Sequence, residues 1–93
     1  MIRSFKGRRT RLFYEGGAVP RQWRAFEQVA VRKLFFLETA MRLEDLRVPP
    51  GNRLEKLRGD RDGQYSIRIN DQWRVCFRWV DGAAEDVEIV DYH

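Results

Sequence analysis

The stretch QYSIRINDQWRVCFRWV (residues 64–80) decides the fold, because apolar and polar residues alternate on both sides of a turn signal. Alternation with a period of two is typical of β-strands that bury one face. The Asn-Asp pair in the middle favours a tight turn between the two runs. The stretch therefore predicts an antiparallel hairpin with one apolar face. That face carries Tyr65, Ile67, Ile69, Trp73, Val75, Phe77 and Trp79.

The register of this hairpin follows from keeping the apolar residues of both strands on the same face. Pairing Ile67 with Val75 achieves this, and it places Arg68 directly opposite Arg74 on the other, open face. Like charges that face each other across a sheet destabilise it. We therefore expect the two arginines, with no carboxylate between them, to bind an anion.

The Asp-Gly pair that follows the hairpin predicts another tight turn, which leads into a strand at residues 85–92. The same rule of register pairs Arg78 with Glu88 as an ion pair on the open face. It also sets Arg74 opposite Tyr92.

Arg68, Arg74 and Tyr92 are thus expected in one row across the open face, with His93 at its edge. Asp91 is the one misfit, because the alternation puts this carboxylate on the core face near an end of the sheet.

The rest of the chain predicts a short strand at residues 2–5, a helix at 8–15, an amphipathic helix within 20–46 and a strand at 53–57. The apolar stripe of the long helix is expected in the core. It consists of Trp23, Phe26, Ala30, Leu34 and Leu37. Residues 1–93 are therefore predicted to be one small α+β domain in the order β-α-α-β-β-β-β. Its antiparallel sheet is packed on one face by the two N-terminal helices.

Charge is distributed unevenly along the chain. The formal net charge is +4, and it divides into +7 for residues 1–34 and −3 for residues 35–93. A basic first third either binds a polyanion, since Lys and Arg neutralise phosphates, or keeps a small domain soluble.

Several classes of protein are not expected from the composition. No run of about 18 apolar residues could span a membrane, and the first residues lack the apolar centre of a secretion signal. Cys76 is the only cysteine, so an internal disulfide is impossible and a reducing cytoplasm is the expected location. With one Cys and one His, His93, we expect neither a metal site nor another cofactor.

The predicted row has the chemistry that phosphodiester cleavage needs. Arg74 is suited to the phosphate, because a guanidinium grips phosphate with two donors and stays charged. His93 titrates near neutral pH and is suited to proton transfer. Tyr92 offers an aromatic face on which an unstacked base can rest.

The stretches MIRSFKGRRTRLFYE (1–15), RLEKLRGDRDGQYSIRINDQWRVCFRW (53–79) and VEIVDYH (87–93) resemble the HigB-type toxins of bacterial toxin–antitoxin pairs, within the RelE superfamily. The resemblance covers the whole chain. It implies a RelE-like fold and a toxin that cuts mRNA in the ribosomal A site without a metal, by attack of the ribose 2′-hydroxyl on the adjacent phosphate. It further implies the 70S ribosome and a helix-turn-helix, HigA-like antitoxin as partners, and no membrane.

Residue by residue, the resemblance implies that Arg74 contacts the scissile phosphate and that His93 transfers a proton. Tyr92 would position RNA, and Asp91 would orient its neighbours. Lys56 and Arg68 are expected to contact RNA.

Two positions depart from the family pattern. Arg58 stands where relatives often carry Lys, and it keeps the charge with a different geometry. Glu55 stands where they often carry His, so we expect it either to act as a base or to pair with an arginine.

Arg8, Arg9 and Arg11 are expected to contact either ribosomal RNA or an acidic partner. Cys76 is expected on the open face, without a role as nucleophile. Two other functions stay open: a non-cleaving, gyrase-poison type of protein-binding inhibitor on the same scaffold, and an inactive RNA-binding regulatory module.

Overall fold

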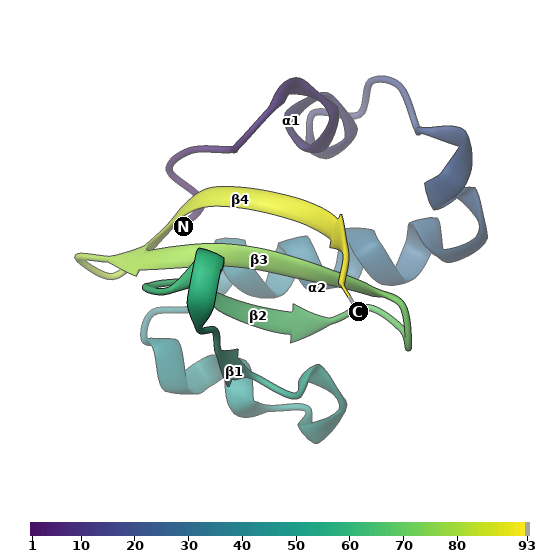
Figure 1. Cartoon of the computed structure of the whole chain (residues 1–93). Coiled ribbons are helices and arrows are strands. Elements are labelled where there is room, and N and C mark those ends of the chain that lie inside the picture. The colour runs from purple at the N-terminus through teal and green to yellow at the C-terminus, as the bar shows by residue number, and fades with distance from the viewer. Residues whose placement is uncertain (93) are drawn as a thin grey trace.

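Four strands form one antiparallel sheet within residues 1–92, the part of the chain that the computed structural model describes (Figure 1). They lie side by side in their sequence order. Their bounds are β1 Glu55–Lys56, β2 Tyr65–Arg68, β3 Trp73–Val80 and β4 Ala83–Asp91. The α+β class and the antiparallel sheet are as predicted.

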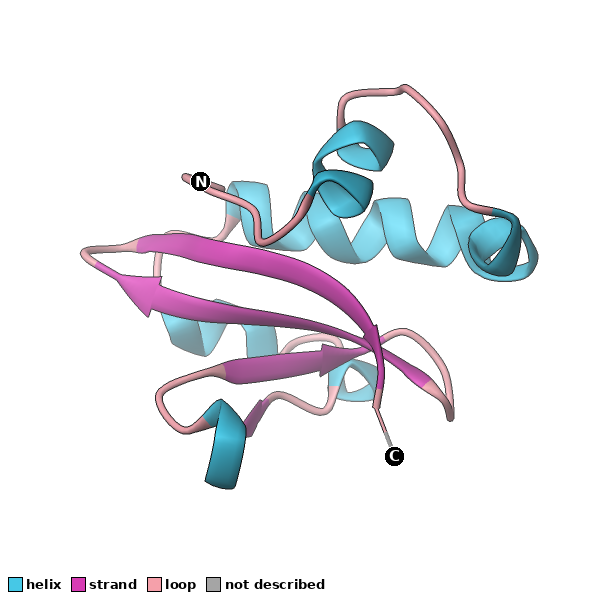
Figure 2. Cartoon of the chain, turned by 45° about the horizontal axis from the view of Figure 1, so that its top comes forward, coloured by secondary structure: helices cyan, strands magenta, loops and turns pink. Residues whose placement is uncertain are grey.

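Two α-helices, α1 Arg8–Tyr14 and α2 Glu27–Thr39, precede the sheet in the sequence and lie on the same side of it (Figures 1 and 2). Four short 3₁₀ helices complete the described fold. They are η1 Arg21–Phe26, η2 Leu43–Arg47, η3 Pro50–Asn52 and η4 Gly59–Arg61. In Figure 1, α2 lies behind the sheet and η4 crosses in front of it, so η4 partly covers the predicted open face.

The predicted core stripe is confirmed, because all five of its side chains are buried. They pack against the apolar face of the sheet, where Ile67, Val75, Phe77 and Val87 are almost completely inaccessible to solvent. Burial of this apolar surface is the main contribution that fixes the helices to one face.

The amphipathic helix predicted within residues 20–46 is present over residues 21–39, but its first part is the 3₁₀ helix η1, and the separate 3₁₀ helix η2 follows it. The chain turns extended at Ala40, and the Asp45 carboxylate then accepts hydrogen bonds from the backbone N–H groups of Met41 and Arg42, both at 3.0 Å. A side chain that caps the backbone in this way competes with continuation of the helix and starts a new turn.

The predicted first strand at residues 2–5 is present only as two isolated parallel bridges, from Ile2 to Ala84 and from Phe5 to Val87. Between them, β4 bulges at Asp86, whose φ is 52°. A bulge leaves an extra residue unpaired and interrupts the ladder, so no regular strand forms beside it.

The predicted register of the first hairpin is confirmed: Ile67 lies opposite Val75, and Arg68 lies opposite Arg74. From Trp73 to Cys76, the pairing of the second hairpin differs from the prediction by two residues, since Arg74 lies opposite Val90 and not Tyr92. A shift of two keeps every side chain before the bulge on its predicted face, because the side-chain period of a strand is two.

The predicted ion pair between Arg78 and Glu88 is wrong, because the pairing between the bulge and the turn differs from the prediction by three residues. Arg78 lies opposite Glu85, and its guanidinium lies 3.5 Å from the Asp86 carboxylate. Glu88 instead pairs with Arg61 of η4 at 3.3 Å.

Candidate functional site

Arg74, at the second position of β3, is held by three oxygen atoms. Its Nη1 donates to Ser66 Oγ at 2.9 Å and to the Arg53 carbonyl at 3.5 Å, and its Nη2 donates to Glu55 Oε1 at 3.0 Å. Only 14% of the side chain is exposed. The guanidinium is therefore fixed in place before any ligand arrives.

The prediction that the facing arginines lack carboxylates is wrong. Glu55 pairs with Arg74, and Asp71 forms an ion pair with Arg68 three residues earlier in the chain. The pairing of β1 with β2 explains the first contact, because Glu55 lies directly opposite Ser66. The Arg74 side chain reaches across Ser66 to meet it.

Both carboxylates remain open to solvent, with 50% of the Glu55 side chain and 99% of the Asp71 side chain exposed. Ion pairs with a solvent-exposed partner contribute little, typically about 0–1 kcal/mol. A phosphate that offers two acceptor oxygens can therefore compete for Arg74. Of the two uses expected for Glu55, the structure shows the pairing with an arginine.

Tyr92 lies beside Arg74, although the two residues are not directly opposite each other in β3 and β4 as predicted. Its backbone N–H donates to the Gln72 carbonyl at 2.8 Å, and its ring centroid lies 5.9 Å from Arg74 Cζ. This distance is within the range of a cation–π contact. The predicted neighbourhood of Arg68, Arg74 and Tyr92 is thus present in the structure.

Asp91 lies opposite Trp73 at the end of the sheet, on the core-face side that the alternation predicted, and is exposed there. Its carboxylate accepts a hydrogen bond from Gln72 Nε2 at 2.8 Å. The Gln72 carbonyl also accepts the hydrogen bond from the Tyr92 N–H, so Gln72 contacts both Asp91 and Tyr92. The predicted role of His93 lies outside the described residues.

Lys56 and Arg58 lie close to this group in the sequence and have exposed side chains. Lys56 is in β1 next to Glu55, and Arg58 is the residue that precedes η4. Both cations are available on the surface, and their predicted contacts with RNA or phosphate stay predictions.

Cys76 is on the predicted face but is completely buried there, which corrects the expectation of an open position. Burial raises the pKa of its thiol to about 11, with smaller opposing effects from Arg61, which lowers it, and Glu88, which raises it. The thiol is protonated at neutral pH, and a protonated thiol is a poor nucleophile. Arg61 reaches this region because η4 folds back toward the sheet.

Arg8, Arg9 and Arg11 are on α1, away from the contacts of Arg74. Arg11 pairs with Glu15 at 3.4 Å, whereas Arg9 donates to Gln22 at 3.2 Å. Arg8 and Arg9 line a separate pocket. The structure therefore divides the predicted RNA-binding residues between two places.

Ser66 is the residue that sequence reasoning did not single out. It is completely buried, and it supplies the shortest hydrogen bond to Arg74. The alternation of β2 does place a small hydroxyl on the same face as Arg68, and this is the signal from which its role could have been inferred.

Two findings concern other functions. Among residues 1–92, no group of three His, Cys, Asp or Glu side chains is arranged to hold a metal ion. In the same residues, no helix is long and apolar enough to cross a bilayer.

Comparison with known proteins gives consistent results. Residues 3–93 match the model of a family described as the RelE-like toxin of type II toxin–antitoxin system HigB. Toxin HigB-1 of Vibrio cholerae is 50% identical over 60 residues, which is 64% of this chain and 63% of that protein. Endoribonuclease HigB of Proteus vulgaris is 34% identical over 100 residues, which covers 100% of both chains.

Among solved structures, a YoeB–YefM complex from Staphylococcus aureus contains a chain with the same fold. The TM-score is 0.62 at 18% identity, and the match covers 100% of this chain and 98% of the other. A heterotetrameric YoeB–YefM complex from the same organism matches with a TM-score of 0.58.

Proposed function

The chain belongs to the HigB family of RelE-like toxins of type II toxin–antitoxin systems, and from this premise we propose that it is an endoribonuclease that cuts mRNA in the A site of the translating ribosome. Its place of action is then the cytoplasm, and a helix-turn-helix antitoxin of the HigA type would neutralise it. The name of the Proteus vulgaris relative, Endoribonuclease HigB, supports the activity.

The observation that carries the proposal is the fixed guanidinium of Arg74. Ser66 and Glu55 orient it, and the ring of Tyr92 lies beside it. Cations that are already in place where charge develops stabilise a transition state without having to reorganise during the reaction. Arg74 is thus suited to the pentacovalent phosphate of a cleavage reaction.

The proposed reaction begins when a base takes the proton of a ribose 2′-hydroxyl. The 2′-oxygen then forms a bond to the adjacent phosphorus while the bond from phosphorus to the 5′-oxygen breaks. An acid donates a proton to the departing 5′-oxygen, and the products are a 2′,3′-cyclic phosphate and a 5′-hydroxyl. Arg74 and Arg58 stabilise the charge on the phosphate, and His93 is assigned to proton transfer.

Tyr92, Arg68 and Lys56 are assigned to holding the RNA. An aromatic ring beside a guanidinium provides a stacking surface for an unpaired base together with a charge for its phosphate. Asp91 is assigned to orienting the end of β4, because Gln72 connects its carboxylate to the backbone of Tyr92.

The test is single-turnover cleavage of mRNA on programmed ribosomes, with identification of the product ends. We expect a cyclic phosphate and a 5′-hydroxyl, and a loss of about 10²–10⁴ in rate for His93→Ala, the usual contribution of a proton-transfer group. Products with a 3′-hydroxyl and a 5′-phosphate would contradict the mechanism. If His93→Ala cleaves mRNA at the parental rate, proton transfer belongs to another residue, and Glu55 is the first candidate.

A further inference from the structure

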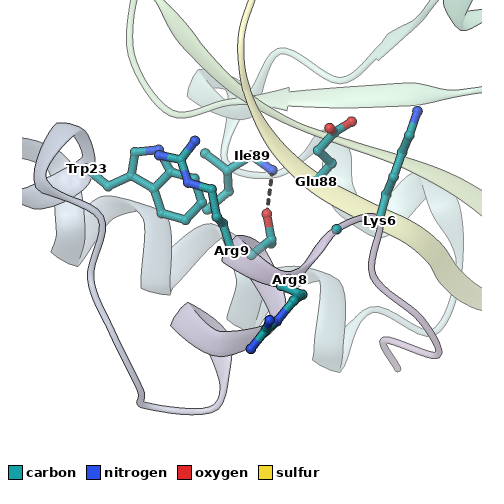
Figure 3. A pocket seen from close by; sticks show the side chains of 8 residues that line it. Lys6, Arg8, Arg9, Trp23, Glu88 and Ile89 are labelled. Atoms are coloured by element: carbon teal, nitrogen blue, oxygen red, sulfur yellow. Dashed lines mark hydrogen bonds between the residues drawn. The ribbon is translucent and has the colours of Figure 1, made fainter.

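A pocket between α1 and β4 contains a set of donors that the proposed reaction does not use (Figure 3). Its volume is about 150 Å³. It is lined by Lys6, Gly7, Arg8, Arg9, Thr10, Trp23, Glu88 and Ile89. Of these eight residues, only Glu88 carries a negative charge, and its carboxylate is already paired with Arg61.

Trp23 gives the pocket an unused hydrogen-bond donor. Its side chain is 1% exposed, and among the buried side-chain polar atoms of residues 1–92 its Nε1 is the one without a hydrogen-bond partner. Buried polar groups are almost always paired, because an unmade hydrogen bond costs free energy. Figure 3 shows the indole nitrogen on the side of the ring that is turned toward Arg9.

The neighbour of the indole cannot satisfy this donor. Arg9 Cζ lies 5.1 Å from the centre of the Trp23 ring, and a guanidinium has donors but no acceptor. Thr10 Oγ1 already accepts a hydrogen bond from Ile89 N at 3.1 Å, so its hydroxyl proton is left to donate. Within the described residues, Lys6, Arg8 and Arg9 form no ion pair. The pocket therefore offers donors and positive charge, and the one carboxylate on its wall, Glu88, is paired with Arg61.

We infer that this pocket binds a carboxylate side chain, a glutamate or aspartate, presented by a protein partner. The Trp23 ring and Ile89 provide apolar walls that suit the methylene groups of such a side chain. A phosphodiester would have to bring its two flanking riboses against the same walls, whereas a carboxylate side chain brings only methylene groups. The inference rests on the proposed function only for the identity of the partner, which is the antitoxin.

The experiment follows the indole N–H resonance of Trp23 by NMR, assigned by elimination with Trp73→Phe and Trp79→Phe. Three probes are titrated at constant ionic strength. They are a capped peptide of alternating alanine and glutamate, the same peptide with glutamine, and a uridine oligonucleotide with the charge of the acidic peptide. We expect the acidic peptide alone to shift this resonance in a saturable way.

Two variants make the test specific to the pocket. Arg9→Gln removes one charge at the pocket and should weaken binding of the acidic peptide about tenfold, as for the loss of one charged hydrogen bond. Arg24→Gln is the matched control, because Arg24 is an exposed cation of η1 that does not line the pocket. It should leave the affinity almost unchanged.

Three results would overturn the inference. One is the absence of any shift of the Trp23 resonance with the acidic peptide. Another is a stronger response to the oligonucleotide, which would make the pocket a nucleic-acid site. The third is an equal loss of affinity in Arg9→Gln and Arg24→Gln, which would show that the peptide responds to the positive charge of the whole protein and not to the pocket. Arg74→Ala should bind the peptide with the affinity of the parent protein. Failure of the pocket inference can therefore be distinguished from failure of the nuclease proposal, because the two depend on different residues.

Discussion

Ser66 and Glu55 set the position of Arg74, and this arrangement decides how single substitutions act. The guanidinium is largely buried between a buried hydroxyl and a half-exposed carboxylate. A substitution at Arg74 therefore affects both the proposed chemistry and the stability of the fold. The sequence alone did not indicate the effect on stability, because Arg74 was expected to lack a carboxylate partner.

Arg74→Ala should lower the rate of ribosome-dependent cleavage by about 10²–10³, the usual effect of losing one group that stabilises the transition state. It should also lower the free energy of unfolding by about 1–3 kcal/mol, because buried Ser66 loses a partner. Single-turnover kinetics and urea unfolding measure the two effects. Arg78→Ala is the matched control, since it removes an arginine four positions further along the same strand. A control that loses as much activity would contradict the special role of Arg74.

Glu55→Gln should retain the rate of the chemical step and lower the KM for programmed ribosomes. The amide oxygen of glutamine can still accept from Arg74, and the negative charge that competes with phosphate is gone. The measurement is the separate determination of kcat and KM. If kcat falls by about 10² or more and the acidic limb of its pH profile disappears, Glu55 is the base and not only a partner of Arg74.

Cys76 gives a prediction about pH. Its pKa is raised from 9.0 to about 11 in the folded protein, so the folded state holds this proton more tightly than the unfolded state. The resulting stabilisation, up to about 2–3 kcal/mol, is fully present below pH 9.0 and is lost as the pH rises through about 11. Tyr14, whose pKa is raised to about 12 by burial and by its hydrogen bond to Glu38, adds to the alkaline loss.

The two contributions can be separated by measuring unfolding free energies of the parent and of Cys76→Ala from neutral to alkaline pH. The difference between the two proteins should shrink above pH 9.0. A difference that does not change with pH would show that the buried thiol does not titrate as described.

At the scale of elements, sequence patterns predicted best where strands are regular. The β2–β3 pairing was correct because alternation on both strands leaves one register that buries every apolar residue, including Ile67 and Val75. The β3–β4 pairing was wrong because the tight turn at Asp81 and Gly82 already pairs Val80 with Ala83, whereas the strand was expected to begin at residue 85, and the bulge at Asp86 then changes the register by one residue. Tyr92 still lies beside Arg74, because a register error of two residues leaves each side chain on the same face of the sheet.

The turn between β3 and β4 depends on backbone conformations that favour glycine. Asp81 and Gly82 both have positive φ, 49° and 79°, as the tight turn of a hairpin requires. Gly82→Ala should lower the free energy of unfolding by about 1–2 kcal/mol, the cost of a left-handed conformation for a residue with a Cβ. Chemical denaturation measures it. Gly51→Ala, at a site of open space and without positive φ, should change little, and equal losses would contradict the explanation.

On the scale of the whole molecule, the basic first third and the Arg74 group form two separate surfaces. The sequence predicted the excess of positive charge in residues 1–34, and the structure places Lys6, Arg8 and Arg9 around the pocket beside β4. Charge counting could not separate the two surfaces, because it does not show which cations already have partners. The Arg74–Glu55 pair, between residues 19 positions apart, became visible only in three dimensions.

The most direct test of the central claim is to map the 5′ ends of cellular mRNA after a brief pulse of expression, with Arg74→Ala as the inactive reference. We predict new ends within translated reading frames, in phase with codons, that are absent from untranslated RNA and from cells treated to block initiation. Purified protein should cleave naked RNA poorly. New ends that are spread equally over translated and untranslated RNA, or growth arrest without any new ends, would contradict a ribosome-dependent nuclease.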